Sequence, residues 1–140
     1  MYLLDLRICT QLLKHPTGAA RRRLLSCKPE DIRLCSIVQG ELLYAARRAR
    51  SSALAEENLQ LLATFFAPLE SLEYCEASAA EYGLMRAEVE RRGLSLNPVE
   101  VMTCAIARVN DAALVTYDAT QTFQRVPGVR FEDWRQYEDG

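Results

Sequence analysis

The chain opens with an apolar run that stops at an acid, Met1-Tyr2-Leu3-Leu4-Asp5. A short apolar run of this kind is typical of a buried strand, here with a carboxylate at its C-terminal end. A second apolar run, Ile32 to Cys35, passes directly into Ser36-Ile37-Val38-Gln39, which we interpret as a capping box that starts a helix. A helix that follows a strand so closely begins at the carboxyl edge of the sheet.

The rest of the chain alternates helices with short strands. The pattern predicts helices over about residues 8–14, 19–27, 36–50, 53–66, 77–92 and 97–109, and further strands over about 69–74, 112–116 and 129–131. Thr17 is expected to cap the second helix, Gly93 to end the fifth in a left-handed conformation, and Asn97-Pro98 to start the sixth. This alternation argues for an α/β fold, with a mostly parallel central sheet of about four to five short strands and helices on both faces.

The length and composition fit one domain with a substantial core. The chain has 140 residues, of which 49% are hydrophobic. We expect a single domain over 1–134 and a loose tail over 135–140. The formal net charge is −2, whereas a general nucleic-acid binder is usually basic. RNA binding would therefore need a local basic patch. The weak candidates, which are more often solvated faces, are Arg21, Arg22, Arg23, Arg47 and Arg48.

The cysteines and the hydropathy pattern point to a reducing, aqueous compartment. There are five cysteines, an odd number, with no C-x-x-C pair, and His15 is the only histidine. This arrangement argues against a zinc site and favours buried, reduced thiols. No secretory signal is recognised, and no apolar run approaches the ~20 residues that cross a membrane. We therefore expect a cytoplasmic protein without a membrane anchor.

Four acids are candidates for a site at the carboxyl edge of the sheet. Asp5 follows the first strand, and Asp118 follows the strand that ends at Thr116. Glu41 lies in the helix after the second strand, and Glu100 lies in the first turn of a later helix. Because ligands of parallel sheets bind outside the carboxyl ends of the strands, these carboxylates can converge on one pocket.

Each acid also has an ordinary structural interpretation. Glu100 stands three residues after Asn97, where an acid completes a helix cap, and the pattern favours that role. Glu41 is as consistent with an exposed helix acid as with a site. Asp118, considered by itself, is more typical of a turn. Asp5 is the hardest to explain in this way, because an acid that ends an apolar strand is partly buried and needs a partner.

A cluster of carboxylates needs a positive charge. Two like charges at ~4 Å repel by about 4 kcal/mol at an effective dielectric constant near 20. Protons or a divalent ion must offset this repulsion, and ligands that are all oxygen suit Mg²⁺ or Mn²⁺. An ion held in this way can activate water and bind a phosphate, which is the chemistry of phosphodiester hydrolysis.

The ordered set of motifs resembles the PIN-domain family, in particular its VapC-type members, over nearly the whole chain. The matching stretches are Met1 to Asp5 with Ile8-Cys9 and Leu12-Leu13-Lys14, Ser36 to Ala45, Tyr82-Gly83, Arg86 to Gly93, Leu96 to Glu100, Leu114 to Asp118, Phe123 to Val129 and Arg130 to Trp134.

The resemblance implies a metal-dependent endoribonuclease toxin of a bacterial type II toxin–antitoxin pair, which hydrolyses phosphodiester bonds in cellular RNA. It further implies Mg²⁺ or Mn²⁺ as cofactor, a small cognate antitoxin as partner, and a homodimer. By motif match, Asp5, Glu41, Glu100 and Asp118 would be the catalytic, metal-coordinating acids.

Three departures from the family pattern bear on activity. Leu6-Arg7 stands where the family has Thr or Ser followed by Asn, Glu100 replaces the usual Asp, and the stretch from Thr116 to Phe123 is longer by about one residue. The Arg7 guanidinium could neutralise the carboxylates and take the place of the metal. The alternative function is then a catalytically degenerate PIN domain that binds or regulates without cleaving. Arg7 could also point outward or bind substrate phosphate.

Overall fold

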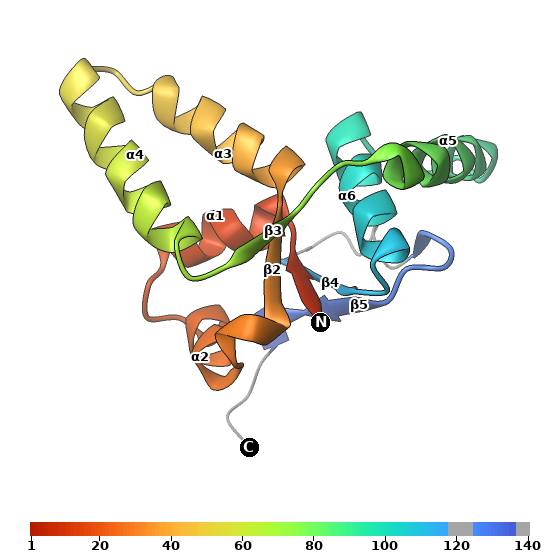
Figure 1. The fold of residues 1–140 in the computed structure, drawn as a ribbon, viewed down its shortest axis with the longest axis horizontal. Helices are drawn as coiled ribbons and strands as arrows, with labels where there is room; N and C mark the ends of the chain where they lie inside the picture. The colour runs from red at the N-terminus through yellow and green to blue at the C-terminus, as the bar shows by residue number, and fades with distance from the viewer. Residues whose placement is uncertain (118–124, 137–140) are drawn as a thin grey trace.

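One sheet of five short parallel strands organises the computed structural model, which describes residues 1–117 and 125–136 (Figure 1). The strands are β1 (Tyr2–Leu4), β2 (Ile32–Cys35), β3 (Glu70–Leu72), β4 (Ala113–Thr116) and β5 (Phe131–Asp133). Their order across the sheet is β3-β2-β1-β4-β5, and every neighbouring pair is parallel. The α/β fold with a parallel sheet is confirmed.

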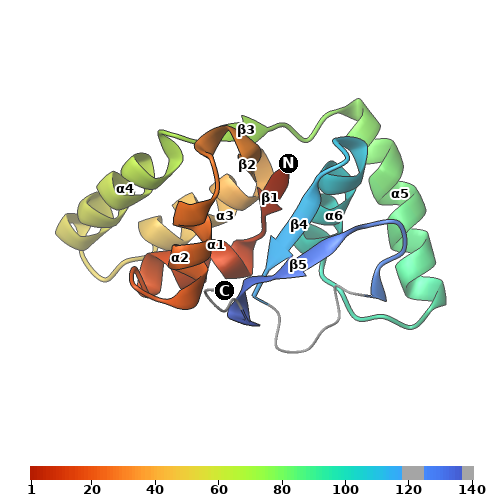
Figure 2. The same cartoon turned by 90° about the horizontal axis from the view of Figure 1, so that it is seen from below.

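Helices connect the strands and cover them. They are α1 (Leu6–Lys14), α2 (Ala19–Ser26), α3 (Ser36–Arg47), α4 (Ser52–Phe66), α5 (Glu76–Arg91) and α6 (Pro98–Val109), with short 3₁₀ turns at Pro29–Asp31 and Trp134–Gln136. Figure 2 shows α1 to α4 gathered on the side of β2 and β3, and α5 and α6 on the side of β4. Helices α3 and α4 pack as a hairpin, and α6 packs against both α5 and α3. None of the helices in the described ranges is both long and apolar enough to cross a membrane.

The strand order reverses at β1. The chain passes from β1 to β2 and β3 on one side, and then crosses back to place β4 and β5 on the other. Parallel sheets bind ligands at such a reversal, outside the carboxyl ends of the two central strands. Leu4 pairs with Val115, and the Asp5 N–H donates to the Val115 carbonyl at 3.0 Å. Asp5 is therefore held at the reversal, beside Thr116.

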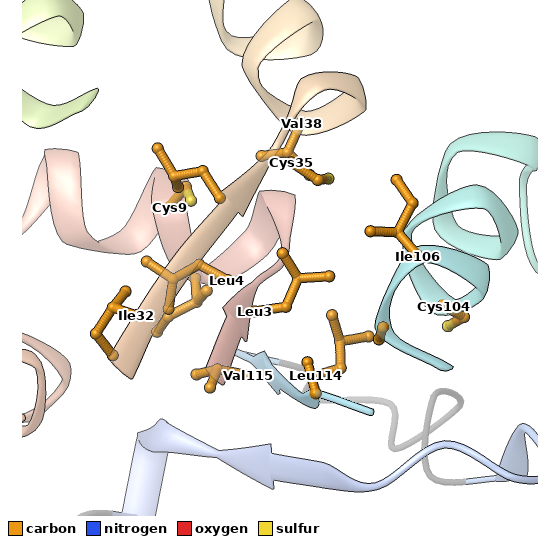
Figure 3. Packing of buried hydrophobic residues seen from close by; sticks show 14 of the residues in the cluster. Leu3, Leu4, Cys9, Ile32, Cys35, Val38, Cys104, Ile106, Leu114 and Val115 are labelled. Atoms are coloured by element: carbon orange, nitrogen blue, oxygen red, sulfur yellow. The ribbon is translucent and has the colours of Figure 1, made fainter. Parts of the chain in front are cut away.

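The core is built from the central strands and the helices that flank them (Figure 3). Leu3, Leu4 and Leu114 are fully buried, as expected for strands covered on both faces. The thiols of Cys9, Cys35 and Cys104 reach this core from α1, the end of β2 and α6. All five cysteines lie in the described ranges and are free thiols, as the sequence predicted. Trp134 is buried in the 3₁₀ turn after β5, which packs against α2.

Some of the predicted helix starts and ends are confirmed, and others are wrong. The Asn97 cap with Pro98 at the first helical position is confirmed, and Gly93 has a φ of +70° at the end of α5. The predicted capping box at Ser36 is wrong, since the N-cap of α3 is Cys35, without a side-chain bond. Thr17 is not the cap of α2 either, because Gly18 takes that position.

The side chains of the supposed capping box bind the β3 segment instead. The Ser36 hydroxyl accepts from the Tyr74 N–H at 3.3 Å, and the Gln39 side-chain oxygen accepts from the Ser71 hydroxyl at 2.7 Å. Their partners are thus 38 and 32 residues away along the chain. The short edge strand β3 needs such bonds, because it is paired on one side only.

Candidate functional site

Asp5 is buried at the switch point of the sheet. It ends β1, caps α1 and has a relative exposure of 2%. One of its carboxylate oxygens, Oδ1, accepts from the Ile8 N–H at 2.8 Å. The N–H groups and the positive dipole end of α1 stabilise a negative charge at this position. The local sequence thus fixes a carboxylate in place where the sheet binds ligands.

Glu100 reaches the same edge from the first turn of α6. It completes a capping box: the Asn97 side chain accepts from the Glu100 N–H at 2.9 Å, and Glu100 Oε2 accepts from the Asn97 N–H at 3.1 Å. The capping role that the sequence favoured is therefore confirmed. The other oxygen, Oε1, accepts from Arg7 Nη2 at 2.9 Å. Because Arg7 lies two residues after Asp5, this ion pair joins the N-terminal turns of α1 and α6.

Buried thiols lie near Asp5, and their surroundings raise their pKa values. Burial raises the pKa of the Cys9 thiol well above its usual range, and the Asp5 charge raises it further. Burial also raises the pKa of Cys104, with smaller contributions from the charges of Asp5 and Glu100. These thiols stay protonated at neutral pH. The thiols therefore face the carboxylates as neutral, weakly polar groups, which strengthens the interaction of the carboxylates with a cation.

Thr116 adds a buried hydroxyl to this edge of the sheet, one that the sequence analysis did not single out. It ends β4 in the position next to Asp5, and it is fully buried. Its Oγ1 has no hydrogen-bond partner among the described residues. A buried hydroxyl in this state costs about 1–3 kcal/mol. Such an unsatisfied group fits a site that takes up a further polar ligand. One sequence signal could have identified Thr116: it is a polar residue at the end of an apolar strand that lies beside the first acid.

The four predicted acids are brought together only in part. The charges of Asp5 and Glu100 both act on the Cys104 thiol, and Arg7, two residues after Asp5, pairs with Glu100. Glu41 is half-buried in the second turn of α3, which packs against α6. Within residues 1–117 and 125–136, no three His, Cys, Asp or Glu side chains are close enough to hold a metal ion. Asp118 lies outside the described residues, so a site formed by all four acids stays a prediction.

The donor set nevertheless fits a hard divalent cation. The carboxylate oxygens of Asp5 and Glu100 that accept the hydrogen bonds described above can each bind a further ligand. Thr116 adds a hydroxyl oxygen at the end of the strand beside Asp5. Oxygen ligands of this kind suit Mg²⁺ or Mn²⁺ and not the softer metals that thiolates select, since the neighbouring thiols are protonated.

The predicted basic residues have different surroundings. Arg23 is an anchor within the fold: its guanidinium donates to Glu132 at 3.0 Å and to the Tyr2 hydroxyl at 3.3 Å, and it lies over the rings of Tyr2 and Trp134. Arg21 lies at an apolar groove, and Arg48 lies over the ring of the exposed Tyr44. RNA contact by this set remains a prediction, and Arg23 is the member with the clearest structural role.

An apolar groove of about 770 Å³ separates α1 and α2 from the α3–α4 hairpin. Its lining includes Leu13, Leu25 and Leu61, whose side chains are exposed although they are large and apolar. The sequence analysis did not predict this groove, because its lining residues follow ordinary amphipathic spacing within each helix. Exposed apolar surface of this kind is typical of a protein-binding site.

Comparison with known proteins identifies relatives over almost the whole chain. The family model described as the PIN domain matches residues 2–129. The chain is 32% identical to the tRNA(fMet)-specific endonuclease VapC of Shigella flexneri, over 95% of this chain and 97% of that protein. It is 30% identical to Ribonuclease VapC2 of Rickettsia felis, over 96% and 98%.

A solved structure has the same fold. The crystal structure of DNA-bound VapBC from Salmonella typhimurium aligns with a TM-score of 0.86 at 30% identity, over 95% of this chain and 97% of that chain. Strands β1 to β4, the buried Asp5 at the switch point and the capped Glu100 lie within the residues that the family model matches. The chain therefore belongs to the PIN-domain family.

Proposed function

We propose that this protein is a metal-dependent endoribonuclease, the toxin of a toxin–antitoxin pair. The observation that carries the proposal is the buried Asp5 carboxylate at the switch point, with Glu100 of α6 tied to the same end of α1 by the Arg7 ion pair. Relatives about as long as this chain are named endonuclease or ribonuclease. Nothing in these comparisons favours the catalytically degenerate alternative.

In this proposal Asp5 and Glu100 hold a Mg²⁺ or Mn²⁺ ion, with Glu41 and Asp118 as the further predicted ligands. When bound, the ion supplies the positive charge that lowers the pKa of a coordinated water and offsets charge on the phosphate. The chain provides the positions: the N-terminal turns of α1 and α6 fix the two carboxylates before substrate arrives. Fixing charged groups in a largely buried site is the main way a protein contributes to such a reaction.

Transfer RNA is the substrate class to test first, because the relative from Shigella flexneri is named for cleavage of tRNA(fMet). Purified protein should cleave initiator tRNA in the presence of Mg²⁺, and chelation should stop the reaction. Asp5→Asn keeps a good helix cap but removes the negative charge, so cleavage should fall by at least about 100-fold without unfolding. Cleavage by Asp5→Asn at the normal rate would refute the assignment.

The apolar groove supports the proposed antitoxin partner. The structural relative from Salmonella typhimurium was solved as a VapBC complex. We propose that a segment of the cognate antitoxin places apolar side chains in the groove, against Leu25 and Leu61. Free thiols throughout the chain fit a location in the reducing cytoplasm.

A homodimer is also part of the proposal. Leu84 on α5 has a relative exposure of 68% and lies outside the groove, so it is a candidate for the contact between protomers. Light scattering of the purified protein would measure its mass. A mass of one protomer at micromolar concentration would remove the dimer from the proposal.

A further inference from the structure

We infer that Arg7 is a built-in counter-ion of the carboxylate site, which a divalent metal ion must displace from Glu100 in order to bind. The inference rests on the proposed function, because it concerns the same two acids. It goes further by naming the residue that sets how tightly the site holds its metal.

The first observation is the contact itself. Arg7 Nη2 donates to Glu100 Oε1 at 2.9 Å, between residues 93 positions apart in the chain. The Glu100 side chain has a relative exposure of only 17%. Its second oxygen already accepts the Asn97 N–H. The carboxylate is therefore held from two sides, and only the Arg7 bond occupies an oxygen that is not needed for the helix cap.

The second observation is the placement of the charge. Arg7 stands in the first turn of α1, two residues after Asp5, and its guanidinium pairs with Glu100, so its charge lies beside a proposed metal ligand. A guanidinium keeps its charge at any working pH. A metal ion bound by Glu100 would therefore meet both competition for Oε1 and repulsion from a fixed positive charge.

The third observation is that Arg7 can leave without unfolding the site. Its side chain has a relative exposure of 38%, more than twice that of its partner. Part of the side chain therefore already faces solvent, and rotation about its long stem can carry the guanidinium, whose Nη1 is buried, out of the site when a cation competes for Glu100. The cap bonds between Asn97 and Glu100 do not involve Arg7, so the acid keeps its place when the guanidinium moves.

Calorimetric titration of Mn²⁺ into the full-length protein, purified free of antitoxin, tests the inference without measuring activity. Arg7→Gln removes the charge, so Mn²⁺ should bind at least about tenfold more tightly than to the unmodified protein. Arg7→Lys keeps a positive charge, and its affinity should stay much closer to the unmodified value. The matched control is Arg92→Gln, which breaks the exposed pair of Arg92 with Glu88 on α5 and should leave affinity unchanged.

Equal or weaker binding by Arg7→Gln would overturn the inference, and so would the absence of Mn²⁺ binding by both proteins. Circular dichroism checks folding, and if Arg7→Gln unfolds, Arg7→Met preserves the apolar stem and serves the same test. Cleavage of tRNA separates this result from the proposed function. Tighter Mn²⁺ binding by Arg7→Gln without cleavage of tRNA supports the counter-ion and counts against tRNA as the substrate. Cleavage of tRNA with unchanged Mn²⁺ affinity supports the nuclease and overturns the counter-ion.

Discussion

At the scale of single residues, the buried hydroxyl of Thr116 gives opposite predictions for stability and activity. Its Oγ1 is buried without a partner among the described residues. Thr116→Val keeps the side-chain shape and removes this group, so the free energy of unfolding without metal should rise by about 1 kcal/mol. Urea denaturation measures this change. Cleavage of RNA should fall at the same time, because the hydroxyl is then missing from the site.

Thr116→Ser is the control for this prediction. It keeps the hydroxyl and removes one methyl group, so stability should fall slightly while cleavage persists. A loss of stability in Thr116→Val would mean that the hydroxyl is already satisfied in the protein without metal.

The cysteines lead to a prediction about pH at the same scale. Cys75 is exposed, and hydrogen bonds from the Ser78 side chain and N–H lower the pKa of its thiol. Burial raises the pKa of Cys9, Cys35 and Cys104. A lower pKa means more thiolate at neutral pH, and the thiolate is the reactive form. A thiol reagent should therefore label Cys75 first, with a half-maximal rate below the usual value of about pH 8.5.

Mass spectrometry after timed labelling identifies the modified residue. Ser78→Ala removes the largest contribution and should move the half-maximal rate of Cys75 toward higher pH. The three buried thiols should react only after denaturation. Early labelling of Cys9 or Cys104 in the native protein would contradict the buried surroundings described for Asp5.

At the scale of secondary-structure elements, Arg23 ties α2 to the last strand. It donates to Glu132 of β5 through Nε and Nη2, and its guanidinium lies 5.8 Å from the centre of the Trp134 ring. Its side chain has a relative exposure of 24%, so solvent screens these bonds only in part. Arg23→Ala should lower the free energy of unfolding by about 2 kcal/mol in urea denaturation.

The control for Arg23 lies in the same helix. Arg21→Ala changes helix propensity by the same amount, but Arg21 lies at the groove and not at β5. It should cost less than about 0.5 kcal/mol. Equal losses for the two variants would mean that α2 and β5 are held together by apolar packing and not by Arg23.

The elements that the sequence predicted correctly are those whose signals are local. The Asn97 cap was readable because both of its bonds span three residues. The Ser36 capping box failed because the true partner of its hydroxyl is the Tyr74 N–H, 38 residues away. The same holds for the short strands. The sequence predicted β3 and β5, but their bounds depend on pairing with β2 and β4, and a local sequence pattern carries no information about that pairing.

At the scale of the whole molecule, the sequence predicts which edge of the sheet holds the candidate site, but not which side chains contact one another there. Parallel strands place Asp5 and the start of α6 at one edge whatever the side chains do. The contact between Arg7 and Glu100 spans 93 residues and depends on how α1 and α6 pack. The sequence indicated that Arg7 matters, and only the packed structure assigns its partner as Glu100.

The apolar groove gives a prediction at this scale, since it exists only when α1, α2, α3 and α4 are assembled. Leu61 lines it with a relative exposure of 59%, so a charge there should leave the stability of the free protein unchanged within about 0.5 kcal/mol. Leu61→Glu should weaken binding of the cognate antitoxin by roughly 10- to 100-fold, because a leucine buried in an interface contributes about 1.5–3 kcal/mol.

Leu54→Glu is the matched control for this prediction, because Leu54 is also an exposed leucine of α4 but lies outside the groove. Calorimetry with purified antitoxin should show weaker binding for Leu61→Glu only. An antitoxin that covers the groove must bury both Leu25 and Leu61, so Leu25→Glu should reproduce the loss. If Leu54→Glu weakens binding and both groove variants do not, the antitoxin binds α4 outside the groove, and the groove has another occupant.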